Sequence, residues 1–545
     1  MRIRRGCIEF LRKVKKMPTL QFKGKNIIWN HHLSVPYHTL DEVSKLHFQP
    51  DKANGNLIIE GDNLLALKAL LPMYAGKVKV VCIDPPYNTG NEGWVYNDNA
   101  NSPLIKDWLG KEVGKDDLTR HDKWLCMMTP RLCLLRDLLA GDGVICINID
   151  DIEVARLINL MDEIFGEGNK EEIICWRRRH NQPNDKSKAI SKVAEFIVVY
   201  AKNLEYLKSK KAFHGLPLTG DFSNPDKDPK GDWASKPWKA GSNQTGTTYK
   251  IISPTGKVLK EEWLGTEETY RKYIDEGRMY FPKGGDGYPR KKYYKFEREE
   301  EGQCAHNFWG HEDFGSNQEA SEEIKPLNIE FDNPKPVRLF RALLTIFSDK
   351  DSLVLDSFSG SGTTGHAVMD LNREDGGNRK FILVQMPEAT EKEPDKNICK
   401  DITRERIRRA IEKYGYDSGF KYLRVGQPLD AETLLKGKLP DYKSFAKYVY
   451  YLCTGENLKE EKKINEKKFC IGTFGTQAIY LIYKQDFESL TRMALNLEIA
   501  EKIIADQPDK KRIVYAPACF LDEEYMEANQ IEFVSIPYNL FQRKS

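Results

Sequence analysis

The sequence predicts an α/β protein whose doubly wound, mostly parallel sheet is interrupted by an inserted region and followed by a smaller α/β domain. Two observations support this prediction. Apolar runs without polar alternation, such as 78–83, are separated by segments with leucines at helical spacing, such as 64–71. Such runs are typical of strands that are buried on both faces of a parallel sheet. The strand-helix order is lost between about 166 and 325 and then returns, which indicates an insertion into one domain.

The composition is that of a large protein without membrane contact. Its 545 residues are too many for one hydrophobic core of ordinary size, so three or so domains are expected. The mean hydropathy is −0.59, and no apolar run approaches the roughly 18 residues of a membrane-spanning helix. Eleven cysteines are scattered without a CxxC pair, as in proteins of a reducing compartment. The sequence therefore predicts a cytoplasmic protein.

The first half of the sheet domain has the order of a βαβ unit. An apolar strand ends at Glu60, a polar turn occupies 61–63, and a helix leads to the strand 78–83. Another helix and an unbroken apolar strand follow within 122–151. Consecutive crossovers of this kind build a parallel sheet with helices on its faces.

The inserted region is polar, punctuated by glycine and proline, and rich in aromatic and basic residues. It contains one clear strand, 195–202. Between 171 and 300 there are about 26 Lys and Arg against about 19 Asp and Glu, a moderate excess that favours either a phosphate-bearing partner or a solvated lysine-rich surface. Cys304, His306 and His311 have the spacing of part of a metal site, but a fourth ligand is missing, so no metal is expected.

After the insertion the strand-helix order returns and then changes to a separate pattern. A helix follows the prolines near 334, a strand at 352–356 leads into a glycine turn, and 380–388 reads as another buried strand. Beyond 426, strand patterns flank a helix expected over 486–505. We expect an N-terminal extension over 1–50, a sheet domain over 51–165 and 326–425, an inserted recognition region over 166–325, and a C-terminal α/β interaction domain over 426–545.

The glycine turn, "LDSFSGSGTTG", follows a strand that ends in Asp356. A phosphate-binding P-loop is disfavoured because Thr363 and Thr364 stand where its lysine would be. A dinucleotide fold and a plain tight turn both remain open. Glycines allow the backbone to approach a ligand closely, while Asp356 can accept hydrogen bonds or face a positive charge.

A second strand exit, "CIDPPYNTG", carries the most distinctive chemistry. Asp84 ends a buried strand, where open α/β sheets bind their ligands. Pro85 and Pro86 cannot donate hydrogen bonds, so the backbone offers rigid carbonyl acceptors beside the acid. Tyr87 adds a flat face, on which a nucleobase could stack. The pattern favours a site that holds the exocyclic amine of a base, although a structural strand exit with a packed tyrosine remains an alternative.

Together, the "DPPY" and "FSGSGTT" motifs resemble the S-adenosylmethionine-dependent amino-methyltransferases of DNA. Aspartate in the first motif position resembles the adenine-N6 enzymes, whereas serine there goes mainly with cytosine N4. The motif order resembles the β-class, a circular permutation of the common order. Over 57–388 the chain is similar to the modification subunit of type III restriction-modification systems. The resemblance implies a Rossmann-like domain and site-specific, adenine-specific DNA methylation by base flipping.

The resemblance also implies roles for individual positions. Asp62 is expected to meet the cofactor's adenine, and Lys335 with the following proline to help close its pocket. One departure from the family pattern is Gln385, which stands where an acid often binds the ribose. The catalytic residues implied are Asp84, Pro85, Pro86 and Tyr87. The implied cofactor-binding residues are Asp62, Lys335, Asp356, Phe358, Gly360, Gly362, Thr363 and Gln385.

The expected partners are double-stranded DNA, a second copy of the chain and a helicase-nuclease restriction subunit. The stretch "WRRRHNQPNDKSK" predicts DNA contacts from Arg177, Arg178, Arg179 and Asn181, with a solvated basic loop as the alternative. Rival interpretations are an enzyme acting on RNA or protein amines, a solitary DNA methyltransferase without a restriction partner, and a non-catalytic DNA-recognition subunit.

Overall fold

The computed structural model describes residues 19–89, 119–182, 189–218, 220–388, 395, 397–429, 433–434, 439–458 and 464–536. Residues 1–18 of the predicted N-terminal extension, and residues 183–188 of the basic stretch, lie outside these ranges. Contacts divide the chain into two compact units. One is formed by Met1–Phe213 and His306–Ser545, and the other by His214–Ala305.

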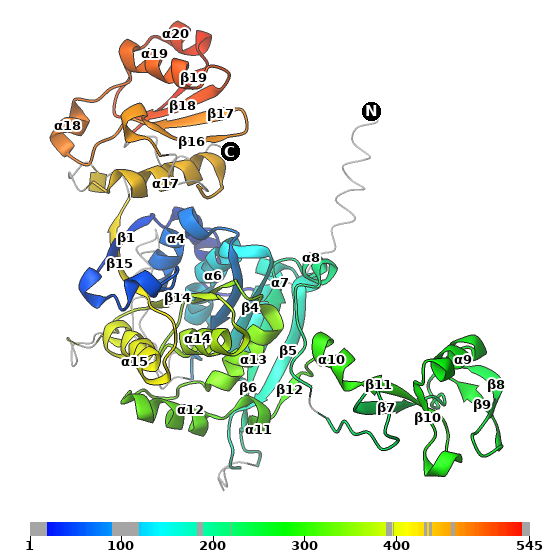
Figure 1. Cartoon of the computed structure of the whole chain (residues 1–545). Helices are drawn as coiled ribbons and strands as arrows, with labels where there is room; N and C mark the ends of the chain where they lie inside the picture. The colour runs from blue at the N-terminus through cyan, green and yellow to red at the C-terminus, as the bar shows by residue number, and fades with distance from the viewer. Residues whose placement is uncertain are drawn as a thin grey trace. The chain divides into compact units, whose positions relative to one another are not determined.

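The larger unit is built on a mixed sheet that contains ten strands within the described residues (Figure 1). Its central strands run parallel, whereas the pairs β1·β15, β4·β6 and β5·β6 are antiparallel. Across the sheet the strands are β1 (His38–Glu42), β15 (Lys421–Pro428), β2 (Leu57–Glu60), β14 (Lys380–Gln385), β13 (Leu353–Asp356), β3 (Val78–Ile83), β4 (Leu139–Ile149), β6 (Ala194–Ala201), β5 (Lys170–Arg177) and β12 (Phe308–Trp309).

Two groups of helices pack against this sheet. The first is α4 (Asn63–Tyr74), α6 (Arg120–Leu138) and α7 (Val154–Phe165), and the second is α13 (Val337–Phe347) and α14 (Thr363–Asp375), with α15 (Arg404–Tyr414) packed on α14. Shorter helices of the same unit are α2 (Lys25–Ile28), α3 (His31–Ser34), α8 (Leu204–Lys210), α11 (His311–Phe314) and α12 (Asn317–Ile324).

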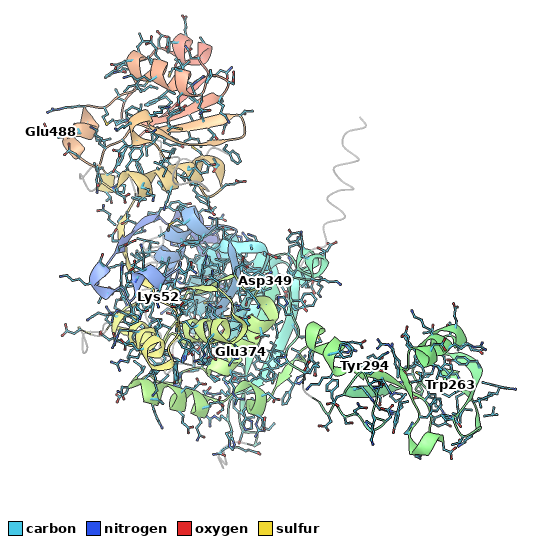
Figure 2. All side chains as sticks on the ribbon, in the orientation of Figure 1. Lys52, Trp263, Tyr294, Asp349, Glu374 and Glu488 are labelled. Carbon is cyan, nitrogen blue, oxygen red and sulfur yellow. The ribbon has the colours of Figure 1, made fainter. Side chains whose placement is uncertain are left out.

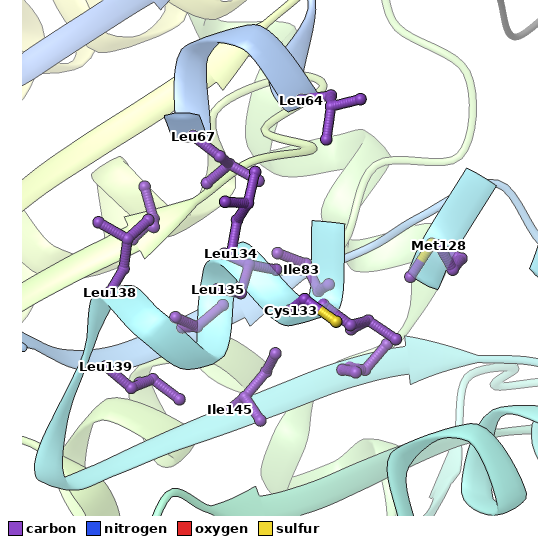
Figure 3. Packing of buried hydrophobic residues seen from close by; sticks show 14 of the residues in the cluster. Leu64, Leu67, Ile83, Met128, Cys133, Leu134, Leu135, Leu138, Leu139 and Ile145 are labelled. Carbon is purple, nitrogen blue, oxygen red and sulfur yellow. The ribbon is translucent and has the colours of Figure 1, made fainter. Parts of the chain in front are cut away.

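The strands are buried on both faces, as the unbroken apolar runs predicted. Ile83 and Ile145 pack with Leu64, Leu67 and Leu134 of the first helix group in one core cluster (Figure 3). The alternate strand residues, such as Val80 and Cys82, are fully buried but lie outside that cluster. Since successive side chains of a strand point to opposite faces, both faces are covered.

The sheet extends into segments that the sequence analysis assigned elsewhere. β5, β6 and β12 lie between 166 and 325, yet they pair with one another and with β4. Similarly, β1 comes from the N-terminal extension and pairs with β15. β6 corresponds to the strand expected over 195–202, whereas the polar stretches around β5 and β12 concealed these two strands. The compact second unit is consequently His214–Ala305, which is shorter than the predicted insertion.

The second unit is a small β-rich body with aromatic cores. Trp263 and Tyr294, labelled in Figure 2, are fully buried. The buried Lys292 ammonium is 2.6 Å from Asp228, and this pair lowers the pKa of Asp228 to about 2 against the effect of its burial. The elements are β7 (Trp233–Pro237), β8 (Thr247–Ile252), β9 (Val258–Trp263), α9 (Glu267–Asp275), β10 (Met279–Tyr280), β11 (Arg290–Tyr294) and α10 (Lys295–Glu301).

The C-terminal region forms its own sheet, in the order β16-β17-β18-β19 within the described residues. The single helix expected over 486–505 is wrong, because the backbone N–H of Leu495 donates to Ala518 (2.8 Å) and the Asn496 side chain caps a new helix. The elements are α17 (Tyr442–Thr454), β16 (Cys470–Phe474), β17 (Gln477–Leu481), α18 (Phe487–Thr491), α19 (Leu497–Asp506), β18 (Lys511–Ala516), α20 (Glu523–Ala528) and β19 (Ile531–Ser535).

None of the helices among the described residues combines the length and apolar character that a membrane crossing requires.

Candidate active site at the carboxyl edge of the sheet

Four neighbouring parallel strands, β2, β14, β13 and β3, end at the same edge of the sheet. From β13 the chain continues to β14 on one side, and from β3 it continues to β4 on the other. The strand order therefore reverses between β13 and β3. Open α/β sheets bind ligands at such a switch point, and here it is flanked by the glycine turn and by the Asp84–Tyr87 stretch.

The Asp84 carboxylate is held by two donors. One oxygen accepts from the Tyr87 hydroxyl at 2.6 Å, and the other accepts from the Lys335 ammonium at 2.9 Å. The carbonyl oxygen of Pro86 accepts from the indole N–H of Trp124 at 2.7 Å. The predicted catalytic stretch is thus fixed at both ends, and Asp84 keeps 28% of its side chain exposed.

Lys335 lies in this site and not only beside the glycine turn. Burial by itself would lower the pKa of Lys335, but the carboxylates of Asp84 and Glu195 raise it overall, so the ammonium stays charged. Its nitrogen is 4.9 Å from the centroid of the Tyr87 ring. Burial, Asp84 and Glu195 also raise the pKa of Tyr87, so its hydroxyl remains a hydrogen-bond donor.

Glu195 is a member of the site that the sequence analysis missed. This buried side chain lies 3.2 Å from the Tyr87 hydroxyl and 3.5 Å from the Lys335 ammonium. It comes from the start of β6, which runs antiparallel to β4 and so begins at the carboxyl edge. A lone acid at the head of the apolar run 195–202 was the signal that could have found it.

The glycine turn is tightly organised around Asp356. This buried carboxylate accepts from the Thr364 hydroxyl at 2.5 Å and from the backbone N–H of Phe358 at 3.0 Å. Burial raises the pKa of Asp356 to about 7 despite these hydrogen bonds. Gly360 and Gly362 have φ angles of 47° and 84°, a region that favours glycine.

Other predicted cofactor residues brace the edge. The Gln385 side chain accepts from the backbone N–H of Gly360 at 2.8 Å and donates to Glu388 at 2.7 Å. Asp62 caps α4 by accepting from two backbone N–H groups. The Thr363 hydroxyl donates to the carbonyl oxygen of Lys335 at 3.2 Å, which ties the glycine turn to the lysine that holds Asp84.

The predicted DNA-contacting residues have different environments. Arg179 and Asn181 are exposed, and Arg177 is half-buried with its guanidinium 4.0 Å from Glu312. Arg178 instead turns toward the site, with its Nε 3.2 Å from Glu195 and 18% of its side chain exposed. Arg178 is therefore paired inside the larger unit.

Cys304, His306 and His311, whose spacing resembles part of a metal site, do not form a metal-binding cluster in the structure. Among the described residues, no group of three His, Cys, Asp or Glu side chains is placed to hold a metal ion. Nδ1 of His311 is 3.0 Å from Glu312.

Comparison with known proteins identifies the family of the chain. A family model described as "DNA methylase" matches residues 78–424. The Mod subunit of the type III restriction-modification enzyme StyLTI of Salmonella typhimurium is 37% identical over 72% of this chain and 62% of its own length. The EcoP15I Mod subunit of Escherichia coli is 30% identical over 71% and 68%, respectively.

A type II methyltransferase, M.KpnI of Klebsiella pneumoniae, is 30% identical over 64% of this chain and 84% of its own length. The chain matches only about three fifths to two thirds of the two Mod subunits. The matched residues include both strand exits of the switch point, and we conclude that the chain belongs to the DNA methylase family.

Proposed function

We propose that the chain is a site-specific DNA methyltransferase that transfers a methyl group from S-adenosylmethionine to N6 of an adenine flipped out of duplex DNA. The observation that carries the proposal is the acceptor stretch Asp84–Tyr87, which follows β3, next to the strand that leads into the glycine turn. Asp84 and the adjacent carbonyl of Pro85 offer acceptors for one amine, and the Tyr87 ring offers a stacking face worth about 1–3 kcal/mol.

The residues of the glycine-turn side fit the cofactor by their chemistry. The buried Ser357 hydroxyl lacks a hydrogen-bond partner among the described residues, and Gln385 and Glu388 carry groups that suit ribose hydroxyls. Asp356 suits a positive charge, while Phe358 and Asp62 suit the adenine ring. When bound, S-adenosylmethionine would supply an electrophilic methyl group on a sulfonium. The chain's own part is to bind and orient the amine beside it.

DNA is the substrate best matched by the rest of the chain. The second unit holds a cavity of about 810 Å³ whose lining includes Lys236, Lys257, Lys283 and Arg290 but a single acid, Asp286. A concave basic surface suits phosphates. We propose that this unit and the exposed Arg179 and Asn181 contact DNA, with the base extruded into the site at a cost of a few kcal/mol.

The similarity to Mod subunits supports a role as the modification subunit of a type III-like system. On this proposal the cytoplasmic chain forms a dimer and binds a helicase-nuclease restriction subunit, and the C-terminal sheet is the candidate docking region. Light scattering of the full chain, and co-purification with a restriction subunit, test these two parts separately.

Long-read sequencing of DNA modified by the purified chain tests the central proposal. N6-methyladenine at one short sequence is the expected result. N4-methylcytosine would show that the methylated amine is that of cytosine. Unmodified DNA in the presence of bound cofactor would favour a non-catalytic recognition subunit. Modified RNA or protein alone would contradict it.

A further inference from the structure

Three charged groups of the site and one hydroxyl form a shared arrangement that goes beyond a single acid and its lysine. Lys335 lies between two carboxylates, 2.9 Å from Asp84 and 3.5 Å from Glu195. The Tyr87 hydroxyl lies between the same two, at 2.6 Å and 3.2 Å. Both donors are therefore closer to Asp84, and both have Glu195 as their second acceptor.

Glu195 is placed to accept more than it holds in this structure. Its side chain is 4% exposed, and its other charged neighbour is Arg178 at 3.2 Å. Two cations and two carboxylates balance one another in this small volume, which a buried carboxylate requires. Its location at the head of an antiparallel strand carries it to the edge where the parallel strands end. Within the described ranges, its contacts are those with Tyr87, Lys335 and Arg178, and none is a helix cap or a turn hydrogen bond.

We propose that Glu195 is a positioning residue that takes over Lys335 and the Tyr87 hydroxyl when Asp84 engages the target amine. A carboxylate oxygen can accept several hydrogen bonds, but each donor held by Asp84 draws on its negative charge. Movement of the two donors to Glu195 leaves Asp84 a stronger acceptor for the amine, while the buried Lys335 ammonium and the buried Glu195 carboxylate remain paired with each other. This inference rests on the proposed function.

The test uses the full chain with cognate DNA and S-adenosylmethionine, under single-turnover conditions. Glu195→Gln keeps the size of the side chain and removes its charge, so that Lys335 stays with Asp84. We expect the transfer rate constant to fall about 30-fold, with cofactor and DNA dissociation constants within about two-fold of the unsubstituted chain. Asp162→Asn is the matched control. Asp162 of α7 accepts a hydrogen bond at 2.6 Å from Tyr200, which lies on the same strand as Glu195, but Asp162 lies outside the network.

A double substitution separates positioning from a merely structural role. Tyr87→Phe removes one of the two donors, so Glu195→Gln should then cost about five-fold instead of about 30-fold. Equal losses in both backgrounds, or a rate constant for Glu195→Gln within two-fold of the unsubstituted chain, would overturn the proposal.

A folding failure of Glu195→Gln would show as lost cofactor binding in calorimetry. In that case Glu195→Asp tests the proposal, because the shorter side chain keeps the charge but places it farther from the Lys335 ammonium and the Tyr87 hydroxyl. A rate at least three-fold lower with unchanged cofactor affinity supports the proposal, and an unchanged rate overturns it. If the unsubstituted chain methylates no DNA, the proposed function fails. If the unsubstituted chain and the Glu195→Gln variant are equally active, the proposed function stands and the inference about Glu195 fails.

Discussion

The ends of β3 and β13 carry an aspartate each, and the two carboxylates differ in their surroundings. Asp84 is 28% exposed and is held by the ammonium of Lys335 and the hydroxyl of Tyr87. Asp356 is 3% exposed, and its hydrogen-bond donors in the part of the chain that the structure describes are neutral, namely the Thr364 hydroxyl and the Phe358 backbone. Burial raises its pKa to about 7.

This difference suggests how one residue type can serve two tasks at one edge of a sheet. The charge beside Asp84 is already supplied by the protein, so the acid is prepared for a neutral amine. Among the described residues no cation is paired with Asp356, which suits that acid to a cationic ligand.

Removal of Lys335 should have the largest effect, and this effect should arise at the end of β3. Lys335→Met leaves Asp84 and Glu195 close together without their shared cation, and loss of one partner of a buried pair typically costs about 3–5 kcal/mol. We expect a loss of this size in the free energy of unfolding, measured by chemical denaturation. Lys350→Met, at an exposed position, is the control and should change little. Equal stability of the two variants would refute the charge balance at the end of β3.

Tyr87 tests whether the end of β3 receives a flat base. Tyr87→Ala should weaken the flipped-base state by about 1–3 kcal/mol, whereas Tyr87→Phe keeps the ring and should retain most activity. Fluorescence of a 2-aminopurine at the target position reports the flipped state. Similar losses in both variants would show that stacking is the wrong explanation.

Asp356 should make cofactor affinity depend on pH. Because its folded pKa is about 7, a cationic ligand must displace a proton below that pH, and affinity should fall about tenfold from pH 8 to pH 6. Calorimetry across this range checks the slope, which Asp356→Asn should abolish. The same raised pKa means that Asp356 favours folding fully below about pH 4, and that this contribution is lost as pH rises through 7.

The arginines outside the strand ends should give the smallest effects. If Arg177 and Arg179 each bind a DNA phosphate, replacing either with alanine should reduce the slope of log affinity against log salt by about one. Arg178→Ala should leave that slope unchanged, because its guanidinium pairs with Glu195. An unchanged slope with altered site preference in the Arg177 or Arg179 variant would indicate base contacts instead.

The sequence allowed prediction of those parts of the site that are contiguous in the chain. Asp84 to Tyr87 and the turn from Asp356 to Thr364 each carry their own local geometry, and parallel strand ends meet at one edge. Glu195 could not be predicted in the same way, because it lies 108 residues from Tyr87 on an antiparallel strand whose partner was not evident. Pairing between distant strands depends on the folded register.

The expected bounds of the inserted region and of the helix over 486–505 differ from the structure for a similar reason. The polar surroundings of β5 and β6 resembled an insertion, although hydrogen bonds to β4 place both strands in the main sheet. The break between α18 and α19 depends on a backbone hydrogen bond from Leu495 to Ala518, a contact that no local pattern reveals.

The most direct test of the contrast measures two quantities on two variants of the full chain. Asp84→Ala should reduce DNA methylation by about a thousandfold or more while cofactor affinity stays within a few-fold. Asp356→Ala should weaken cofactor binding by tenfold or more at pH 8, and its methylation should recover substantially at saturating cofactor. Calorimetry with S-adenosylmethionine and single-turnover methylation supply both readouts. Equal loss of binding and transfer in both folded variants would contradict the assignment of separate tasks to the two strand ends.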